Sequence, residues 1–201
     1  MTAFRWLPSV VWLLFASIVA AESGPPPTPL PSGEVTSTGI IATSSEPGER
    51  LIVTGQVFAP DGVTPVPDVI VYAYQTDAAG LYHNDASGIA RLHGWAKTDA
   101  TGDFEFRTIR PSPYPNRSIP AHIHFHAWGG GYPLQWTEDL KFVGDPLLSP
   151  RDIADSEALG DFRNVRAVDR GPNGVWRCSI RFRLRKQTNY AAQSRDDPRM
   201  R

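Results

Sequence analysis

Residues 176–184 read Trp176-Arg177-Cys178-Ser179-Ile180-Arg181-Phe182-Arg183-Leu184, a strict alternation of apolar and polar side chains. Alternation with a period of two predicts a β-strand that turns one face to a core and the other to water. Cys178 falls on the apolar face, which indicates a buried thiol rather than a nucleophile. Because Cys178 is the only cysteine, an intramolecular disulfide and a multi-cysteine metal site are both excluded.

Three further runs, rich in β-branched and aromatic residues, predict strands at 51–58, 69–75 and 103–109. Turn-forming residues separate these runs, and the chain contains 17 glycines and 19 prolines. One short helix is expected over 152–160, and strands do not alternate with helices. These patterns predict an all-β fold: an antiparallel β-sandwich core with long loops and at most one or two short helices.

The two ends of the 201-residue chain differ in composition from its body. An apolar run follows Arg5 and ends in Ala20 and Ala21, which is typical of a secretory signal peptide over 1–21. Residues 22–48 are rich in proline and serine and predict a flexible arm, 49–188 form the expected domain, and 189–201 form a polar tail. We therefore expect a secreted protein, periplasmic or extracellular, with no integral membrane span after signal cleavage.

The charges nearly balance, with 20 Lys and Arg against 21 Asp and Glu, a formal net charge of −1. This balance argues against a basic surface for nucleic acid or membrane, so no nucleic-acid partner and no other polyanion is expected. An apolar content of 41% excludes wholesale disorder. The composition does not fix the oligomeric state, and a homo-oligomer is compatible with it.

Three of the five histidines stand at alternate positions: His122, His124 and His126. In a strand, alternate side chains share one face, so neighbouring imidazoles can turn toward one metal ion. Ordinary hydrogen-bonded histidines are an equally good reading of this pattern taken alone. Copper or zinc on the same histidine face is a further reading, because both ions accept imidazole ligands.

Two tyrosines lie in loops rather than in predicted core strands. Tyr114 stands between Pro113 and Pro115, which restrict the backbone and fix the direction of the phenol. Tyr82 follows the strand predicted at 69–75. Two phenols together with two imidazoles suit a hard, highly charged ion, and a ferric ion lowers a tyrosine pKa toward the phenolate.

An ordered series of motifs resembles the intradiol ring-cleavage dioxygenases, especially the protocatechuate 3,4-dioxygenase group, over residues 50–185. The motifs are Gly55-x-Val57, Gln75-x-Asp77-x-x-Gly80-x-Tyr82, Arg91-x-x-Gly94-Trp95-x-x-Thr98-Asp99-x-x-Gly102-x-Phe104-x-Phe106, Thr108-Ile109-Arg110-Pro111-x-x-Tyr114-Pro115, Pro120-Ala121-His122-Ile123-His124 and Phe142-x-Gly144-Asp145-Pro146-Leu147. The resemblance implies a β-sandwich holding a mononuclear, non-haem Fe(III) on Tyr82, Tyr114, His122 and His124.

The resemblance also implies the reaction. Catechol and O2 are the implied partners, both oxygen atoms enter the product, and the ring opens to a muconate-type diacid. Tyr114 is the implied displaceable ligand and general base. His126 falls outside the implied ligand set, so it is expected in a supporting or pocket position.

Two positions depart from the family pattern. Ile119 stands where the family usually has an arginine whose cation stabilises charge on the substrate. Arg117, two residues earlier, reaches the same space if the segment is extended, and Arg110 is the other candidate. Asp139 stands where the family tends to have glutamine, which places an anion in the pocket wall.

Two functions from different classes remain open at this point. The first is a secreted ferric intradiol dioxygenase, and the second is an exported, non-catalytic iron- or phenol-binding module, a reading motivated by Ile119. Arg91 fits either a clamp for a substrate carboxylate or a structural ion pair, and the structural reading is favoured.

Overall fold

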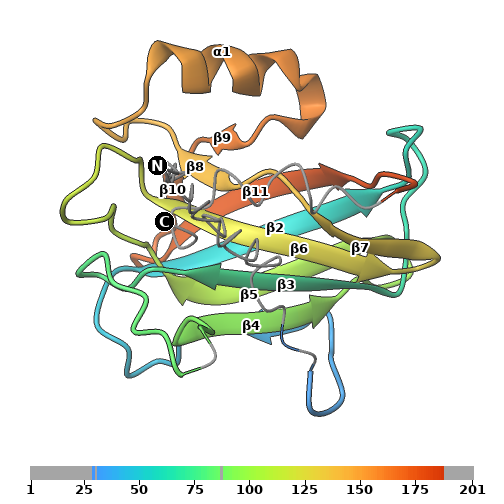
Figure 1. Ribbon diagram of the computed structural model, residues 1–201, viewed down its shortest axis with the longest axis horizontal. Helices are drawn as coiled ribbons and strands as arrows, with labels where there is room; N and C mark the ends of the chain where they lie inside the picture. Colours follow the sequence, from blue (N-terminus) through green and yellow to red (C-terminus); the bar gives the residue numbers. More distant parts are fainter. Residues whose placement is uncertain (1–28, 30, 87, 188–201) are drawn as a thin grey trace, which may run out of the picture.

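The computed structural model describes residues 29, 31–86 and 88–187 (Figure 1). The predicted signal peptide and the predicted polar tail lie outside the described residues. Among the residues that are described, no helix is long and apolar enough to cross a membrane.

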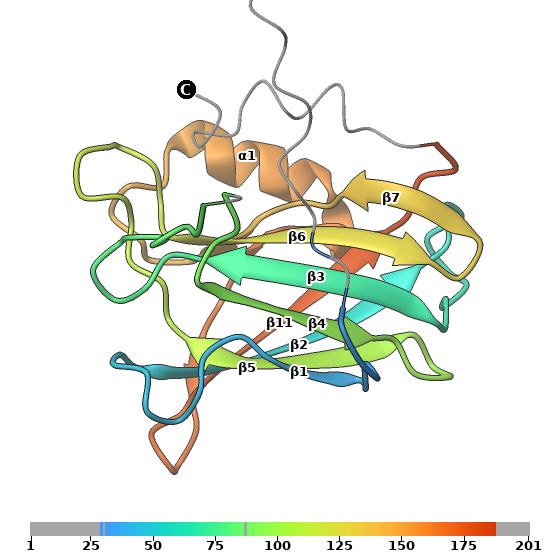
Figure 2. The same cartoon turned by 60° about the horizontal axis from the view of Figure 1, so that its bottom comes forward.

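Two mixed β-sheets pack face to face, which confirms the all-β sandwich (Figures 1 and 2). The first sheet has the order β1 (Thr38–Ile40), β5 (Asp103–Ile109), β2 (Arg50–Phe58), β11 (Trp176–Arg183) and β10 (Asp169–Arg170). The second has the order β4 (Leu92–Lys97), β3 (Val69–Gln75), β6 (His122–Gly129), β8 (Leu140–Phe142) and β9 (Val165–Arg166), while β7 (Tyr132–Trp136) pairs with β6.

The pairing is less uniformly antiparallel than the sequence pattern predicts. β11 runs parallel to β2 along its whole length, from Trp176 beside Leu51 to Arg183 beside Phe58. Parallel neighbours need a long connection, and here the chain between them builds the entire second sheet. Alternation reveals which face of a strand is buried, but it does not reveal the direction of a partner so distant in sequence.

The alternating face of β11 is buried as predicted. Cys178, Ile180 and Phe182 point into the core between the sheets, while Arg177 and Arg181 are exposed. Burial raises the pKa of the Cys178 thiol to about 11, so the thiol stays protonated and packs as a small apolar group.

The strand β6 is buried on both faces. Ile123 and Phe125 enter the core between the sheets, whereas the three alternate histidines point to the outer face of the second sheet. Loops 76–91 and 110–121 lie together at the end of β3 and β6 (Figures 1 and 2). The histidine face is therefore covered by loops and not by a third sheet.

The described part of the predicted arm packs against the domain. Thr38 pairs with Glu105 as β1 extends the first sheet beside β5, and the indole nitrogen of Trp95 donates to the carbonyl oxygen of Pro29 at 2.8 Å. The domain predicted to start at residue 49 is thus extended by an edge strand from the preceding segment. Proline and serine content suggested a free arm because it carries no information about backbone hydrogen bonds to a distant strand.

In the described part of the chain there is one α-helix, α1 (Pro150–Ala158), close to its expected place at 152–160. It begins earlier because Ser149 caps it: the Ser149 side chain accepts from the Asp152 backbone, and Asp152 in turn accepts from the Ser149 backbone. A short 3₁₀ turn, Gly160–Phe162, follows.

The core contacts of β11 allow a stability test. Ile180→Ala empties a buried position and is expected to lower the free energy of unfolding by about 2–5 kcal/mol. Arg177→Ala, on the exposed face of the same strand, is expected to change it by less than about 0.5 kcal/mol. Denaturant unfolding measures both, and equal effects of the two substitutions would contradict the assigned faces of β11.

Candidate metal centre

Four side chains from three parts of the chain meet on the outer face of the second sheet. His122 and His124 come from the start of β6. Tyr82 comes from the loop that follows β3, and Tyr114 comes from the loop that precedes β6. Both histidines are buried and both tyrosines are half-buried.

The donor atoms of these four side chains form a closed ring. Tyr82 Oη lies 2.5 Å from Tyr114 Oη, and Tyr114 Oη lies 3.3 Å from His122 Nε2. His122 Nε2 lies 2.9 Å from His124 Nε2, which lies 2.9 Å from Tyr82 Oη. Two phenol oxygens and two imidazole nitrogens thus converge on one point, as predicted for a metal centre. Their role as ligands stays a prediction.

The outer nitrogens of the two imidazoles show that this donor set fits a cation. His122 Nδ1 lies 2.7 Å from the carbonyl oxygen of Pro120, which can only accept, so we assign the proton to Nδ1. His124 Nδ1 lies 2.8 Å from a carboxylate oxygen of Asp139 and donates to it. In neutral rings both Nε2 atoms then carry lone pairs, 2.9 Å apart, which can accept from the phenol hydroxyls of Tyr82 and Tyr114. A metal ion bound between the four side chains would take these lone pairs in place of the phenol protons.

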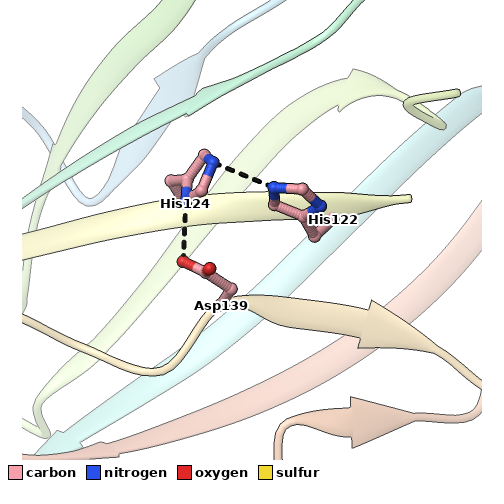
Figure 3. A group of neighbouring side chains, drawn as sticks. All are labelled: His122, His124 and Asp139. Atoms are coloured by element: carbon pink, nitrogen blue, oxygen red, sulfur yellow. Dashed lines mark hydrogen bonds and ion pairs between the residues drawn. The ribbon is translucent and has the colours of Figure 1, made fainter. Parts of the chain in front are cut away.

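Asp139 orients His124 rather than joining the ring of donors. It lies with His122 and His124 in a group whose possible ligand atoms are all within 4.8 Å of one another (Figure 3). Its contact, however, is with Nδ1, on the side of the His124 ring away from Tyr82. A carboxylate on the outer nitrogen of a ligating histidine fixes the ring and makes it a stronger donor.

The electrostatics favour the protonation states that a metal centre needs. Burial, and then the neighbouring His124, lower the pKa of His122 from 6.5 to about 4, so its ring is neutral at pH 7. Burial alone would raise the pKa of Asp139, but the charge and hydrogen bond of His124 outweigh burial and bring it to about 2. At neutral pH, His122 therefore offers a lone pair and Asp139 is an acceptor.

An aromatic layer lies beside the histidines on the same face of the sheet, and the sequence alone predicts no role at the site for its tyrosines, Tyr72 and Tyr74. Tyr74 pairs with His124 across the strands and stacks on its ring, with centroids 4.6 Å apart. His126 lies in the same layer, 4.4 Å from the ring of Trp136 and 5.6 Å from that of Tyr72. Tyr72 and Tyr74 alternate as the histidines do, and this shared period was the signal that could have placed them beside the site.

The loop that carries Tyr82 is held by Asp77. One carboxylate oxygen of Asp77 accepts from the backbone nitrogens of Ala79 and Leu81. Gly80 presses against the neighbouring loop, where a side-chain carbon at this position would lie 2.2 Å from the carbonyl oxygen of Pro113. This close approach brings the loops of Tyr82 and Tyr114 together.

Arg91 has a structural partner. Its guanidinium forms a two-pronged ion pair with Glu46, at 2.7 and 2.8 Å, and lies 3.4 Å from Asp77. This arrangement matches the structural ion pair favoured from the sequence. Arg91 therefore ties the segment before β2 to the loop that carries Tyr82.

The two arginines considered as replacements for the family's cation lie in different surroundings. Arg110 lies 4.9 Å from the ring of Trp176 and 3.4 Å from Glu49, so its charge is engaged there. Arg117 is exposed and lines a hollow of about 300 Å³ together with Tyr82 and Tyr114. The segment around Arg117 is a turn rather than an extended strand, because its backbone nitrogen donates to the Tyr114 carbonyl. The proline pair that flanks Tyr114 favours that turn.

Comparison with known proteins adds independent information. A family model described as Dioxygenase matches residues 27–186. The protocatechuate 3,4-dioxygenase beta chain of Burkholderia cepacia is 38% identical over 114 residues, covering 51% of this chain and 48% of that protein. Catechol 1,2-dioxygenase 1 of Acinetobacter lwoffii is 30% identical over 140 residues, covering 58% and 44%. The chain thus spans about half the length of these curated relatives.

Solved structures show the same fold. The dioxygenase domain of a dioxygenase carbohydrate-binding protein fusion from Streptomyces sp. SirexAA-E is 32% identical, with a TM-score of 0.56, covering 80% of this chain and 97% of that one. An intradiol ring-cleavage dioxygenase from Tetranychus urticae is 19% identical, with a TM-score of 0.56 over 82% and 93% of the two chains. At that identity, the second likeness shows the fold alone.

The carboxylate of Asp139 provides a test of the metal centre. Asp139→Asn removes the charge that orients His124, so the affinity for Fe(III) is expected to fall about 10- to 100-fold. The matched control is Glu138→Gln, because the neighbouring carboxylate pairs with Arg185 instead. Competition with a chelator measures both affinities, and an unchanged affinity in Asp139→Asn would contradict the orienting role.

Proposed function

The chain belongs to the intradiol ring-cleavage dioxygenase family, and from this premise we propose that it is an Fe(III)-dependent enzyme that opens catechol-type rings with O2. The observation that carries the proposal is the ring of four donor atoms on Tyr82, Tyr114, His122 and His124. Phenolate oxygens and imidazole nitrogens suit a ferric ion, and two phenolates favour ferric over ferrous iron.

The four donors would hold the ion, and the rest of the chain would hold the donors. A bound ferric ion supplies Lewis-acid activation of the catechol ring toward O2. Asp139 and the Pro120 carbonyl fix the two imidazoles through their outer nitrogens. Tyr74 stacks on the His124 ring from the neighbouring strand, which would limit the movement of this ligand when another ligand leaves.

Tyr114 is the residue placed to accept a proton. It lies between the second tyrosine and His122, in a loop, and it also lines the hollow through which a catechol would arrive. A phenolate at this position can take the proton of a catechol hydroxyl on Oη as the substrate binds. Loop attachment lets its side chain give way without moving β6.

Arg117 would supply positive charge above the substrate. It lies at the exposed edge of the same hollow, whereas Ile119 brings no charge and Arg110 is engaged elsewhere. An exposed cation stabilises negative charge on the substrate less than a buried one does. We therefore propose that Arg117 has a supporting electrostatic role. The proposed substrates are catechol-type diols, and the proposed products are muconate-type diacids.

The non-catalytic alternative rests on the same two residues. Ile119 removes the cation that the family usually directs at the substrate, and Arg117 is exposed to solvent. A protein that binds iron and catechol but consumes no O2 would favour the binding module over the enzyme.

Substitution of the donors tests the enzyme. Tyr114→Phe and His124→Ala are each expected to reduce catechol-dependent O2 uptake about 100-fold or more, because each removes a donor atom from the ring. The control is Tyr132→Phe, which removes a phenol on β7 and is expected to leave uptake unchanged. An oxygen electrode provides the measurement. Full uptake by both donor variants would contradict the proposal.

We also propose that the enzyme is exported. The support is the pattern of residues 1–21, with a charge at Arg5, an apolar run and a small-residue end at Ala21. Expression with export machinery is expected to yield a protein outside the cytoplasm whose first residue is Glu22. N-terminal sequencing of the fractionated protein measures this, and recovery of the uncut chain in the cytoplasm would contradict export.

A further inference from the structure

Positive charge gathers in one part of the sequence despite the neutral total. Between Asp161 and Lys186 the chain places eight of its 20 Lys and Arg residues but only two of its 21 Asp and Glu. We call six of these cations the arginine face: Arg163, Arg166, Arg170, Arg177, Arg181 and Arg183. Four of them, Arg163, Arg166, Arg177 and Arg181, line one hollow. All except the half-buried Arg166 are exposed.

The arginine face lies away from the metal centre, and none of its residues lines the hollow beside Tyr82 and Tyr114. Arg177, Arg181 and Arg183 alternate with the core residues of β11, so they point outward from the first sheet. The histidines of β6 point outward from the second sheet, and the core between the sheets separates them from these three arginines. A ligand on the arginine face would therefore leave the entrance to the metal centre open.

These arginines have no carboxylate partners among the described residues. None of the six forms an ion pair there. By contrast, Arg91, Arg107, Arg110, Arg151 and Arg185 are each paired with a carboxylate. Four of these cations line one hollow with only two carboxylates, Asp161 and Asp169, so a bound anion would relieve the repulsion between them.

Three aromatic rings hold guanidinium groups in place. Arg181 lies 5.2 Å above the ring of Phe58, Arg183 lies 5.2 Å above Phe162, and Arg170 lies 5.4 Å above Trp176. Stacking restricts these long side chains before any ligand arrives, and less entropy is then lost on binding. Of these three, Arg181 also lines the hollow described next, where its planar fork is placed for a two-pronged contact with a carboxylate.

A hollow of about 690 Å³ lies along this surface, and its lining is mixed. Four of the arginines line it, but so do the carboxylates of Asp161 and Asp169 and the hydroxyls of Thr54 and Ser179. The carboxylates repel a ligand that carries only negative charge. They accept hydrogen bonds from a ligand that also carries hydroxyl groups.

We propose that this hollow binds an acidic polysaccharide of the uronate type, in which each sugar carries one carboxylate and several hydroxyls. The carboxylates match the arginine forks, and the hydroxyls match the acceptors on Asp161 and Asp169. A nucleic acid fits less well, because the rings that could stack on bases are covered by guanidinium groups. A flat membrane surface fits less well because the arginines line a concave hollow.

Calorimetric titration of the full-length chain with polygalacturonate tests the proposal. Saturable binding is expected, and Arg177→Gln/Arg181→Gln is expected to weaken it at least about tenfold through the loss of two charged contacts. Arg151→Gln/Lys97→Gln carries the same change in net charge away from the hollow and is expected to weaken binding less than twofold. Both variants should keep full catechol-dependent O2 uptake, since none of these residues touches the metal centre.

Three further probes separate the chemistries. Fully methyl-esterified polygalacturonate keeps hydroxyls but loses charge, whereas polyglutamate keeps carboxylates but lacks the sugar hydroxyls. Both should bind at least about tenfold more weakly than polygalacturonate, as should single-stranded poly(dT) at matched charge. The proposal is overturned by absence of saturable binding, by an equal loss in both double variants, or by equal or tighter binding of any of these probes.

If the arginine double variant unfolds, Arg177→Gln alone serves the same comparison, since Arg177 is exposed and stacks on no ring of the described residues.

Discussion

The division of β6 into two buried faces is the constraint on which the rest of the structure depends. One face supplies Ile123 and Phe125 to the core between the sheets, so the strand cannot shift register without exposing them. That fixed register sets the positions of His122 and His124 on the other face. Packing in the hydrophobic core therefore fixes the positions of the two histidines. The loops then bring Tyr82 and Tyr114 to this histidine pair.

The hydrogen bonds on the outer imidazole nitrogens explain how this arrangement can hold a cation. The Pro120 carbonyl and the Asp139 carboxylate occupy the outer nitrogens, which leaves both Nε2 atoms pointing at each other. Burial keeps the ring of His122 neutral at pH 7, so its Nε2 lone pair is available to a metal ion or to the Tyr114 hydroxyl.

Local pattern and family motif predicted much of this, and the remainder depends on contacts between distant residues. The alternation at 176–184 predicted the buried face of β11, and the residues predicted as ligands do converge. Sequence could not reveal that β2 and β11 run parallel, nor that β1 joins the first sheet, since both depend on partners far along the chain. The net charge of −1 led to the expectation of no polyanion partner, but this sum does not show where charges lie along the chain. Six arginines fall between residues 163 and 183.

Metal content and visible absorption of the purified protein show whether the four side chains hold iron together. We expect one iron per chain and a charge-transfer band from tyrosinate to Fe(III) that shifts when catechol is added without O2. This outcome requires the phenols of Tyr82 and Tyr114 to reach the same ion as the two imidazoles. A protein that takes up zinc or copper in preference to iron, or that holds iron without such a band, would contradict it.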